Sequence, residues 1–170
     1  GHRDELPAEL IAAENFTHVR PLGPDFTSLL RALSHSVRAR VRQAEDYGLT
    51  VRRVTDARDV RHYHALAVRT VRRRGGLPKP LTLYQRIFRS LVPLGLARYD
   101  LVEHRGRAIG GSLHFTYRGT ALNWLTVSDD RHLLLRPNNL IIARVMRDLC
   151  EAGYHEYNLG GSPPDAEGLI

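Results

Sequence analysis

Two groups of residues near the end of the chain have types and spacing that suit ligand binding. Arg136, Asn138 and Asn139 stand where a helix should begin, so a guanidinium, side-chain amides and free backbone N–H groups would meet there. Gly160 and Gly161 form a pair at the expected end of a strand, where a bare backbone can approach a ligand closely. Both features suit an anionic or polar ligand. The alternatives are an ordinary helix cap and an ordinary turn.

The elements that would hold these residues lie between Thr120 and Ser162. Residues 121–127 predict a strand, residues 138–151 a helix that Gly153 ends, and residues 154–159 a second strand. The apolar face of the helix is formed by Leu140, Ile141, Val145 and Leu149. A strand–helix–strand crossover makes the two strands parallel neighbours. The loop before the helix then lies at the carboxyl end of the first strand, where α/β sheets bind ligands.

The composition indicates one soluble domain with a strongly basic surface. The chain has 170 residues and a formal charge of +7, and arginine carries nearly all of the positive charge because Lys79 is the only lysine. This bias reflects either a GC-rich genome or a polyanionic partner, such as a nucleotide cofactor, RNA or an anionic membrane face. No apolar run approaches the length of a membrane span. The single cysteine, Cys150, fits a reducing compartment, so we expect a cytoplasmic protein.

The remaining elements follow from apolar periodicity and turn residues. Gly1 and His2 resemble a cloning scar, residues 1–15 form an N-terminal segment with a short helix over 7–13, and residues 16–170 form one domain. An edge strand is expected over 16–22, helices over 25–47, 56–74 and from 82 to about 92, and strands over 49–54, 97–103 and 108–117. Gly110 and Gly111 suggest a bulge or a close backbone approach.

Few residues suit covalent or metal chemistry. The nine histidines show no metal-ligand spacing, so no metal site is expected, and no nucleophile elbow, phosphate loop or catalytic-cysteine context is present. His114 lies inside a strand, as either a buried, hydrogen-bonded histidine or a base. Tyr157 and Asn158 are neighbours on a strand, so only one of them can line a given cleft.

Four segments carry a family resemblance, and so does the order of the elements. The segments are VRARVRQAEDYGLTV (37–51), RTVRRRGGLP (69–78), RPNNL (136–140) and GYHEYNLGGS (153–162). In this order they resemble the second half of Fem-type and BioF2-like acyltransferase domains, within the GNAT superfamily of N-acetyltransferases. The resemblance covers roughly residues 16–170.

The resemblance implies a fold and a reaction. The fold would be α/β, with a central, mostly antiparallel sheet, one splayed parallel strand pair and helices on both faces. The reaction would be direct attack of an amine on the acyl group of acyl-CoA or aminoacyl-tRNA, with no tightly bound cofactor. GNAT proteins usually carry glycines before the donor-binding helix, whereas the segment Leu134–Asn139 has none, so the donor stays open between these two classes.

The resemblance also implies roles for particular residues. The catalytic residues would be Tyr157 and His114. The donor-binding residues would be Arg136, Asn138, Asn139, Val127, Gly160 and Gly161. The acceptor-binding residues would be Tyr63, Arg69, Arg72 and Trp124.

The expected substrates and partners follow from the same resemblance. The acceptor would be a small-molecule or peptide amine, as in bacterial cell-envelope chemistry, and tRNA is a candidate partner. Fem-type proteins usually carry two GNAT-like halves, and further strands follow the position of Ile170 in their pattern. We therefore also expect that a second copy or a partner domain completes the sheet. The alternative function is a non-catalytic module that binds RNA or forms half of a larger transferase.

Overall fold

A six-stranded mixed sheet forms the centre of the molecule. The structure is a computed structural model, and it describes residues 16–162. The strands are β1 (Phe16–Pro21), β2 (Thr50–Arg53), β3 (Ala97–His104), β4 (Arg107–Tyr117), β5 (Thr120–Ser128) and β6 (Glu156–Ser162). Their order is β1-β6-β5-β4-β3-β2, and every neighbouring pair is antiparallel except β5 and β6. This sheet confirms the predicted fold class and the parallel pair.

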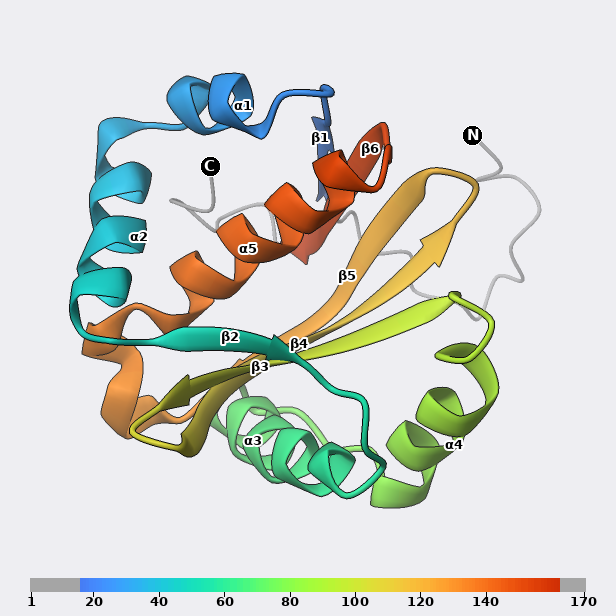
Figure 1. Cartoon of the computed structure of the whole chain (residues 1–170). Coiled ribbons are helices and arrows are strands. Elements are labelled where there is room, and N and C mark those ends of the chain that lie inside the picture. The colour runs from blue at the N-terminus through green and yellow to red at the C-terminus, as the bar shows by residue number, and fades with distance from the viewer. Residues whose placement is uncertain (1–15, 163–170) are drawn as a thin grey trace, which may run out of the picture.

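Helices cover both faces of the sheet (Figure 1). They are α1 (Phe26–Ala32), α2 (His35–Asp46), α3 (Asp59–Arg73), α4 (Leu81–Leu91) and α5 (Pro137–Glu151), with a short 3-10 helix, η2 (Asp130–Leu135), before α5. One core cluster contains the buried residues of α2 and α5, and a second contains those of α3 and α4. The apolar face predicted for residues 138–151 is buried in the first of these clusters.

The helix predicted over 25–47 is wrong, because the structure has two helices there. Leu33 is extended, with φ −71° and ψ 151°, and Ser34 caps α2 by accepting a hydrogen bond from the Val37 N–H. The Arg38 guanidinium then donates to the carbonyl oxygens of Arg31 and Leu33 at the end of α1. The apolar spacing runs through both helices, so periodicity alone did not reveal the break.

Two smaller predictions also change. The strand predicted over 154–159 begins at Glu156 and continues to Ser162, because its last residues pair with β1. Its glycine pair therefore lies inside a strand. The register shift expected near Gly110 and Gly111 is found beside them, and a Cβ on Gly111 would lie 2.9 Å from the Asp100 carbonyl oxygen. The helix predicted over 7–13 lies outside the described residues.

None of the helices in the described part of the chain is long and apolar enough to cross a membrane.

Candidate functional site

The parallel strands β5 and β6 separate soon after they meet. They pair only from Thr120 opposite Glu156 to Leu122 opposite Asn158. Beyond this point the Asn123 side chain bridges the gap, because its Nδ2 donates to the Leu159 carbonyl oxygen at 3.3 Å. A space between the two strands therefore opens directly after Asn123.

Irregularities in both strands shape this opening. In β5, Trp124 is an extra residue between the pairs that join Asn123 and Leu125 to β4. In β6, Leu159 and Gly160 together lie opposite the single residue His18 of β1. Gly160 has φ +93°, and a Cβ there would lie 3.0 Å from the Asn123 carbonyl oxygen. Only glycine meets both conditions without strain, so this residue sets the width of the opening.

A concave site of about 460 Å³, which we call the splay cleft, occupies this opening. It is lined by β5 residues 122–126, by Leu159, Gly160 and Gly161 of β6, by His18 and Arg20 of β1, by Asn138, Asn139, Ile142, Ala143 and Met146 of α5, and by Leu33, Val37, Arg40 and Arg74. Among the described residues that line it, none is a carboxylate. Three arginines beside apolar side chains make the site favourable for an anionic ligand that also has apolar parts.

The start of α5 forms one end of the splay cleft. The backbone of Arg136 has the left-handed conformation, with φ 62°, and Pro137 follows as the first residue of the helix. Pro137 has no N–H, and the Leu140 N–H donates to the Arg136 carbonyl. The backbone N–H groups of Asn138 and Asn139 are therefore the ones left without a partner inside the helix at this terminus. The Oδ1 atom of Asn138 is buried and accepts no hydrogen bond from the described residues. A buried acceptor of this kind suits a ligand that donates to it.

The donor-binding residues predicted from sequence are brought together only in part. Asn138, Asn139, Gly160 and Gly161 all line the splay cleft. The side chain of Arg136 instead reaches the Gln43 side chain, with Nε 3.4 Å from Oε1. Val127 is fully buried in the core cluster beneath α3 and α4.

The two residues predicted as catalytic, His114 and Tyr157, form a buried pair beside the cleft. The Tyr157 hydroxyl and His114 Nε2 are 2.7 Å apart, and neither residue lines the cleft. Burial lowers the pKa of His114 to about 3 and raises the pKa of Tyr157 above its ordinary value. At neutral pH both groups are therefore uncharged and shielded, so the geometry favours a positioning role over the predicted direct proton transfer.

The predicted acceptor-binding residues are spread over two surfaces. Trp124 lines the splay cleft and packs against Tyr84 and Phe115. Tyr63 is fully buried, and its hydroxyl donates to the Leu125 carbonyl at 2.7 Å.

The arginines predicted to hold the acceptor lie on α3. The Arg69 guanidinium is 3.1 Å from Asp129, in a separate hollow of about 400 Å³, and Arg72 is exposed. Hydrogen bonds from Arg131 lower the pKa of Asp129. Arg69 is therefore already paired with a carboxylate in the described structure.

Sequence reasoning missed four basic residues of the splay cleft. His18 and Arg20 come from the edge strand, Arg40 from α2 and Arg74 from the end of α3. Arg40 and Arg74 belong to arginine-rich runs of the sequence, Arg38–Arg42 and Arg69–Arg74. No local pattern showed that they meet β1 at one cleft. Among the described residues, no group of three or more His, Cys, Asp or Glu could hold a metal ion.

The fold is shared with solved structures of low sequence identity. FemX superposes with a TM-score of 0.81 at 17% identity, over 91% of this chain and 55% of FemX. L-PGS from Bacillus licheniformis gives a TM-score of 0.60 at 13% identity, over 92% of this chain and 51% of that one. A predicted acetyltransferase from Clostridium acetobutylicum, solved with acetyl-CoA, gives a TM-score of 0.55 at 12% identity, over 64% of this chain and 78% of that chain. The chain thus spans about half the length of FemX and L-PGS.

The sequence also matches a family model. No curated protein sequence matches the chain. Residues 31–167 match the model of the acetyltransferase (GNAT) domain, and this range includes α2, the splayed strands and α5. The predicted resemblance is confirmed, and the chain belongs to the GNAT acetyltransferase-domain family.

Proposed function

We propose that this chain transfers an acyl or aminoacyl group to an amine, with the acyl donor held in the splay cleft. One observation carries the proposal: a concave site opens where β5 and β6 separate, beside the start of α5, and its lining within residues 16–162 includes three arginines and no carboxylate. Acyl-CoA and aminoacyl-tRNA both join an activated carbonyl to phosphate groups. Both therefore match a cleft with cationic walls and a narrow polar opening between strands.

The proposed reaction needs no covalent enzyme intermediate. The amine lone pair attacks the carbonyl carbon of the thioester or ester, and a tetrahedral oxyanion forms. A backbone N–H near the Trp124 bulge would stabilise that charge. The C–S or C–O bond then breaks, the amine loses one proton, and the leaving thiolate or alkoxide gains one.

We assign the proton acceptor to His18. Of the described side chains that line the splay cleft, His18 is the only imidazole, and the rest are arginines, amides, a threonine or apolar. A neutral imidazole nitrogen can accept the proton that the attacking amine loses. His18 lies opposite Leu159 and Gly160, next to the point where the strands separate. The charged groups that share its cleft are Arg20, Arg40 and Arg74.

The donor's phosphates would be held by side chains more than by backbone. Only the backbone N–H groups of Asn138 and Asn139 remain free to bind a ligand at the α5 terminus, because Pro137 lacks an N–H and the Leu140 N–H is already used within the helix. A glycine-rich loop that wraps a pyrophosphate has no counterpart here. Arg40 and Arg74 stand at the cleft wall, and arginine binds phosphate through paired hydrogen bonds.

The remaining predicted roles fit around this arrangement as proposals. Trp124 would contact the acceptor at the bulge, and Tyr63 would hold the Leu125 backbone in place through its hydroxyl. Arg69 and Arg72 lie on α3 and would bind an acceptor carboxylate only from that side. The reducing environment suggested by the buried, unpaired Cys150 is consistent with a cytoplasmic reaction on a cell-envelope precursor.

A second function, a non-catalytic half of a larger transferase, is favoured by the burial of His114 and Tyr157, because neither residue predicted as catalytic lines the cleft. The chain spans only 55% of FemX and 51% of L-PGS. In that case the splay cleft would bind a donor or RNA, and a second copy or a partner domain would complete the site.

Donor binding and product formation separate these two functions. We expect acetyl-CoA or an aminoacyl-tRNA to raise the melting temperature of the chain. Arg74→Ala should weaken this effect, whereas Arg89→Ala on α4, outside the cleft, should not. Acyl transfer from that donor to a panel of amines would then show the enzyme. Binding without transfer would favour the non-catalytic half, and no response to either donor would refute the proposal.

A further inference from the structure

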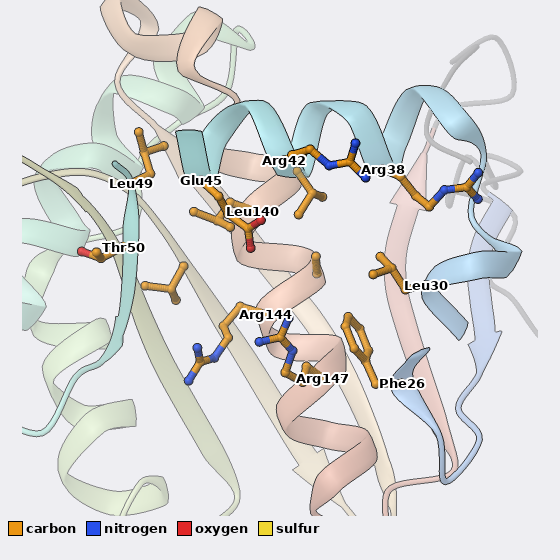
Figure 2. Close-up of a pocket in the computed structure, with 13 residues that line it drawn as sticks. Phe26, Leu30, Arg38, Arg42, Glu45, Leu49, Thr50, Leu140, Arg144 and Arg147 are labelled. Carbon is orange, nitrogen blue, oxygen red and sulfur yellow. The ribbon is translucent and has the colours of Figure 1, made fainter. Parts of the chain in front are cut away.

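A second basic cavity lies on the other side of α2 from the splay cleft. This α2–α5 groove has a volume of about 490 Å³ and lies between α1, α2, β2 and α5 (Figure 2). Arg38 and Arg42 of α2 line the groove, whereas Arg40 lines the splay cleft. Residues two apart on a helix point in nearly opposite directions, which explains how one helix serves both cavities.

Two of the groove's arginines lack a carboxylate partner. Arg42 is exposed and forms no ion pair with any residue in 16–162. The Arg147 guanidinium lies over the Phe26 ring, 5.1 Å from its centroid, and likewise pairs with no carboxylate in the described range. A stacked guanidinium keeps its charge and its edge N–H donors, so both groups can bind an anion.

The other two arginines of the groove add positive charge at its rim. Arg38 donates to backbone carbonyl oxygens, which leaves its charge uncompensated. Arg144 forms an ion pair with Asp148 at 3.0 Å, but Asp148 also forms ion pairs with Arg98 and Arg53. Arg98 is paired with Asp100 as well, so two carboxylates, Asp148 and Asp100, offset the three guanidinium groups of Arg144, Arg98 and Arg53.

One acidic group, Glu45, also lines the groove. It forms no ion pair with the described residues, and Figure 2 shows its carboxylate turned into the groove. A ligand with a hydrogen-bond donor, such as a hydroxyl or an amine, could bind Glu45 in place of water while its anionic part contacts the arginines. Phe26, Leu30 and Leu140 supply apolar surface between these polar groups.

We propose that the α2–α5 groove binds a phosphate ester of a small organic molecule, at a site separate from the splay cleft. The phosphate would lie against Arg42 and Arg147, which bind its oxygens through charge-assisted hydrogen bonds. The organic part would pack on the apolar wall and donate to Glu45. The concave shape and the volume are those of a small-molecule site rather than of a flat protein interface.

The proposal does not depend on acyl transfer, but the two sites share structure. Ala143 of α5 lines both cavities, and α2 contributes a wall to each. A ligand in the groove would thus contact the same helix as a ligand in the cleft.

Calorimetric titration with adenosine monophosphate, with adenosine as the matched probe without phosphate, tests the proposal. The wild-type chain should bind the monophosphate saturably and adenosine more weakly. Arg42→Ala should lower the affinity about tenfold, as expected for loss of one charge-assisted contact. Arg40→Ala, on the cleft side of α2, and Arg89→Ala, on α4, should each change it by less than about twofold. Arg42 is exposed and unpaired within the described structure, so an unchanged melting temperature should confirm that its variant folds.

The other outcomes would overturn the proposal. Equal losses in Arg42→Ala and Arg89→Ala would indicate general charge attraction. A loss confined to Arg40→Ala would place the ligand in the splay cleft, and no saturable binding by the wild-type chain would refute the site. A short RNA that binds far more tightly and depends equally on Arg40 and Arg42 would make the two cavities one polyanion track instead.

Discussion

Replacing Tyr157 by Phe separates a positioning role from a catalytic one. The substitution removes a hydroxyl that lies 2.7 Å from His114 Nε2 and leaves the ring in place. Both residues are almost fully buried, at 0% and 1% exposure, so water cannot replace the lost partner. The other imidazole nitrogen, Nδ1, already has no hydrogen-bond partner among the described residues. The variant would therefore leave a buried imidazole without a partner at either nitrogen.

The cost follows from the unmet hydrogen bond. A buried polar group left without its partner destabilises a protein by about 1–3 kcal/mol. For a domain of this size, 2 kcal/mol corresponds to a melting temperature lower by about 4–8 °C. Urea unfolding at pH 7.5 and a thermal scan measure both quantities. The matched control is Tyr117→Phe, because Tyr117 is 63% exposed and its ring contact with Arg118 survives the change.

Activity then decides the role of the pair. A positioning role predicts that Tyr157→Phe lowers stability and changes the rate of acyl transfer only modestly, while donor binding persists. The double variant Tyr157→Phe, His114→Leu should recover part of the lost stability, because both polar groups are then removed. Unchanged stability together with complete loss of transfer would refute this reasoning and return Tyr157 to the chemistry.

Three further predictions concern the same framework. The folded-state pKa of His114, about 3, lies below its unfolded value of 6.5, so the folded state binds fewer protons. The stability that this shift contributes is therefore complete above about pH 6.5 and falls as the pH drops toward 3. In urea unfolding, the free energy of unfolding should be about 2 kcal/mol lower at pH 5 than at pH 7.5, and His114→Leu should abolish this difference. Gly160→Ala should lower the free energy of unfolding by about 1–3 kcal/mol and weaken donor binding, because alanine is strained at φ +93° and its Cβ would clash with the Asn123 carbonyl. Unchanged donor binding would mean that Gly160 does not set the width of the cleft. Arg98→Ala should lower the free energy of unfolding by about 3–5 kcal/mol in the same assay, because it removes the arginine that pairs with the buried Asp100 carboxylate. A decrease below about 1 kcal/mol would show that water reaches this pair.

The local architecture could be predicted from sequence because its signals are local. The crossover from β5 through α5 to β6 has apolar periodicity, a glycine stop and a fixed handedness, and these make the two strands parallel. Because the two strands are parallel, one cleft is lined both by the start of α5, at Asn138 and Asn139, and by the glycine pair of β6. Each of these residues belongs to one continuous unit of about forty residues.

The composition of the cleft could not be predicted, because it depends on distant contacts. His18 reaches the site only because β1 pairs with β6, about 140 positions away in the chain. The partnership of His114 and Tyr157 likewise joins β4 to β6 across β5. Sequence patterns placed both residues on strands but gave no register between those strands. The roles assigned to them as catalytic groups came from family resemblance, which carries no information on burial.

The arginine excess had two readings, genome composition and an anionic partner, and the structure gives a reason to prefer the second. A compositional bias alone would scatter arginines over the surface, where each meets water or the nearest carboxylate. Some arginines do follow that pattern, such as Arg58 with Asp56 and Arg131 with Asp129. Others converge on two concave sites, and the part of the splay cleft wall that the structure describes contains no carboxylate. Gathering like charges in a cavity is unfavourable unless a ligand neutralises them, so the arginines that line these cavities are best explained by anionic ligands.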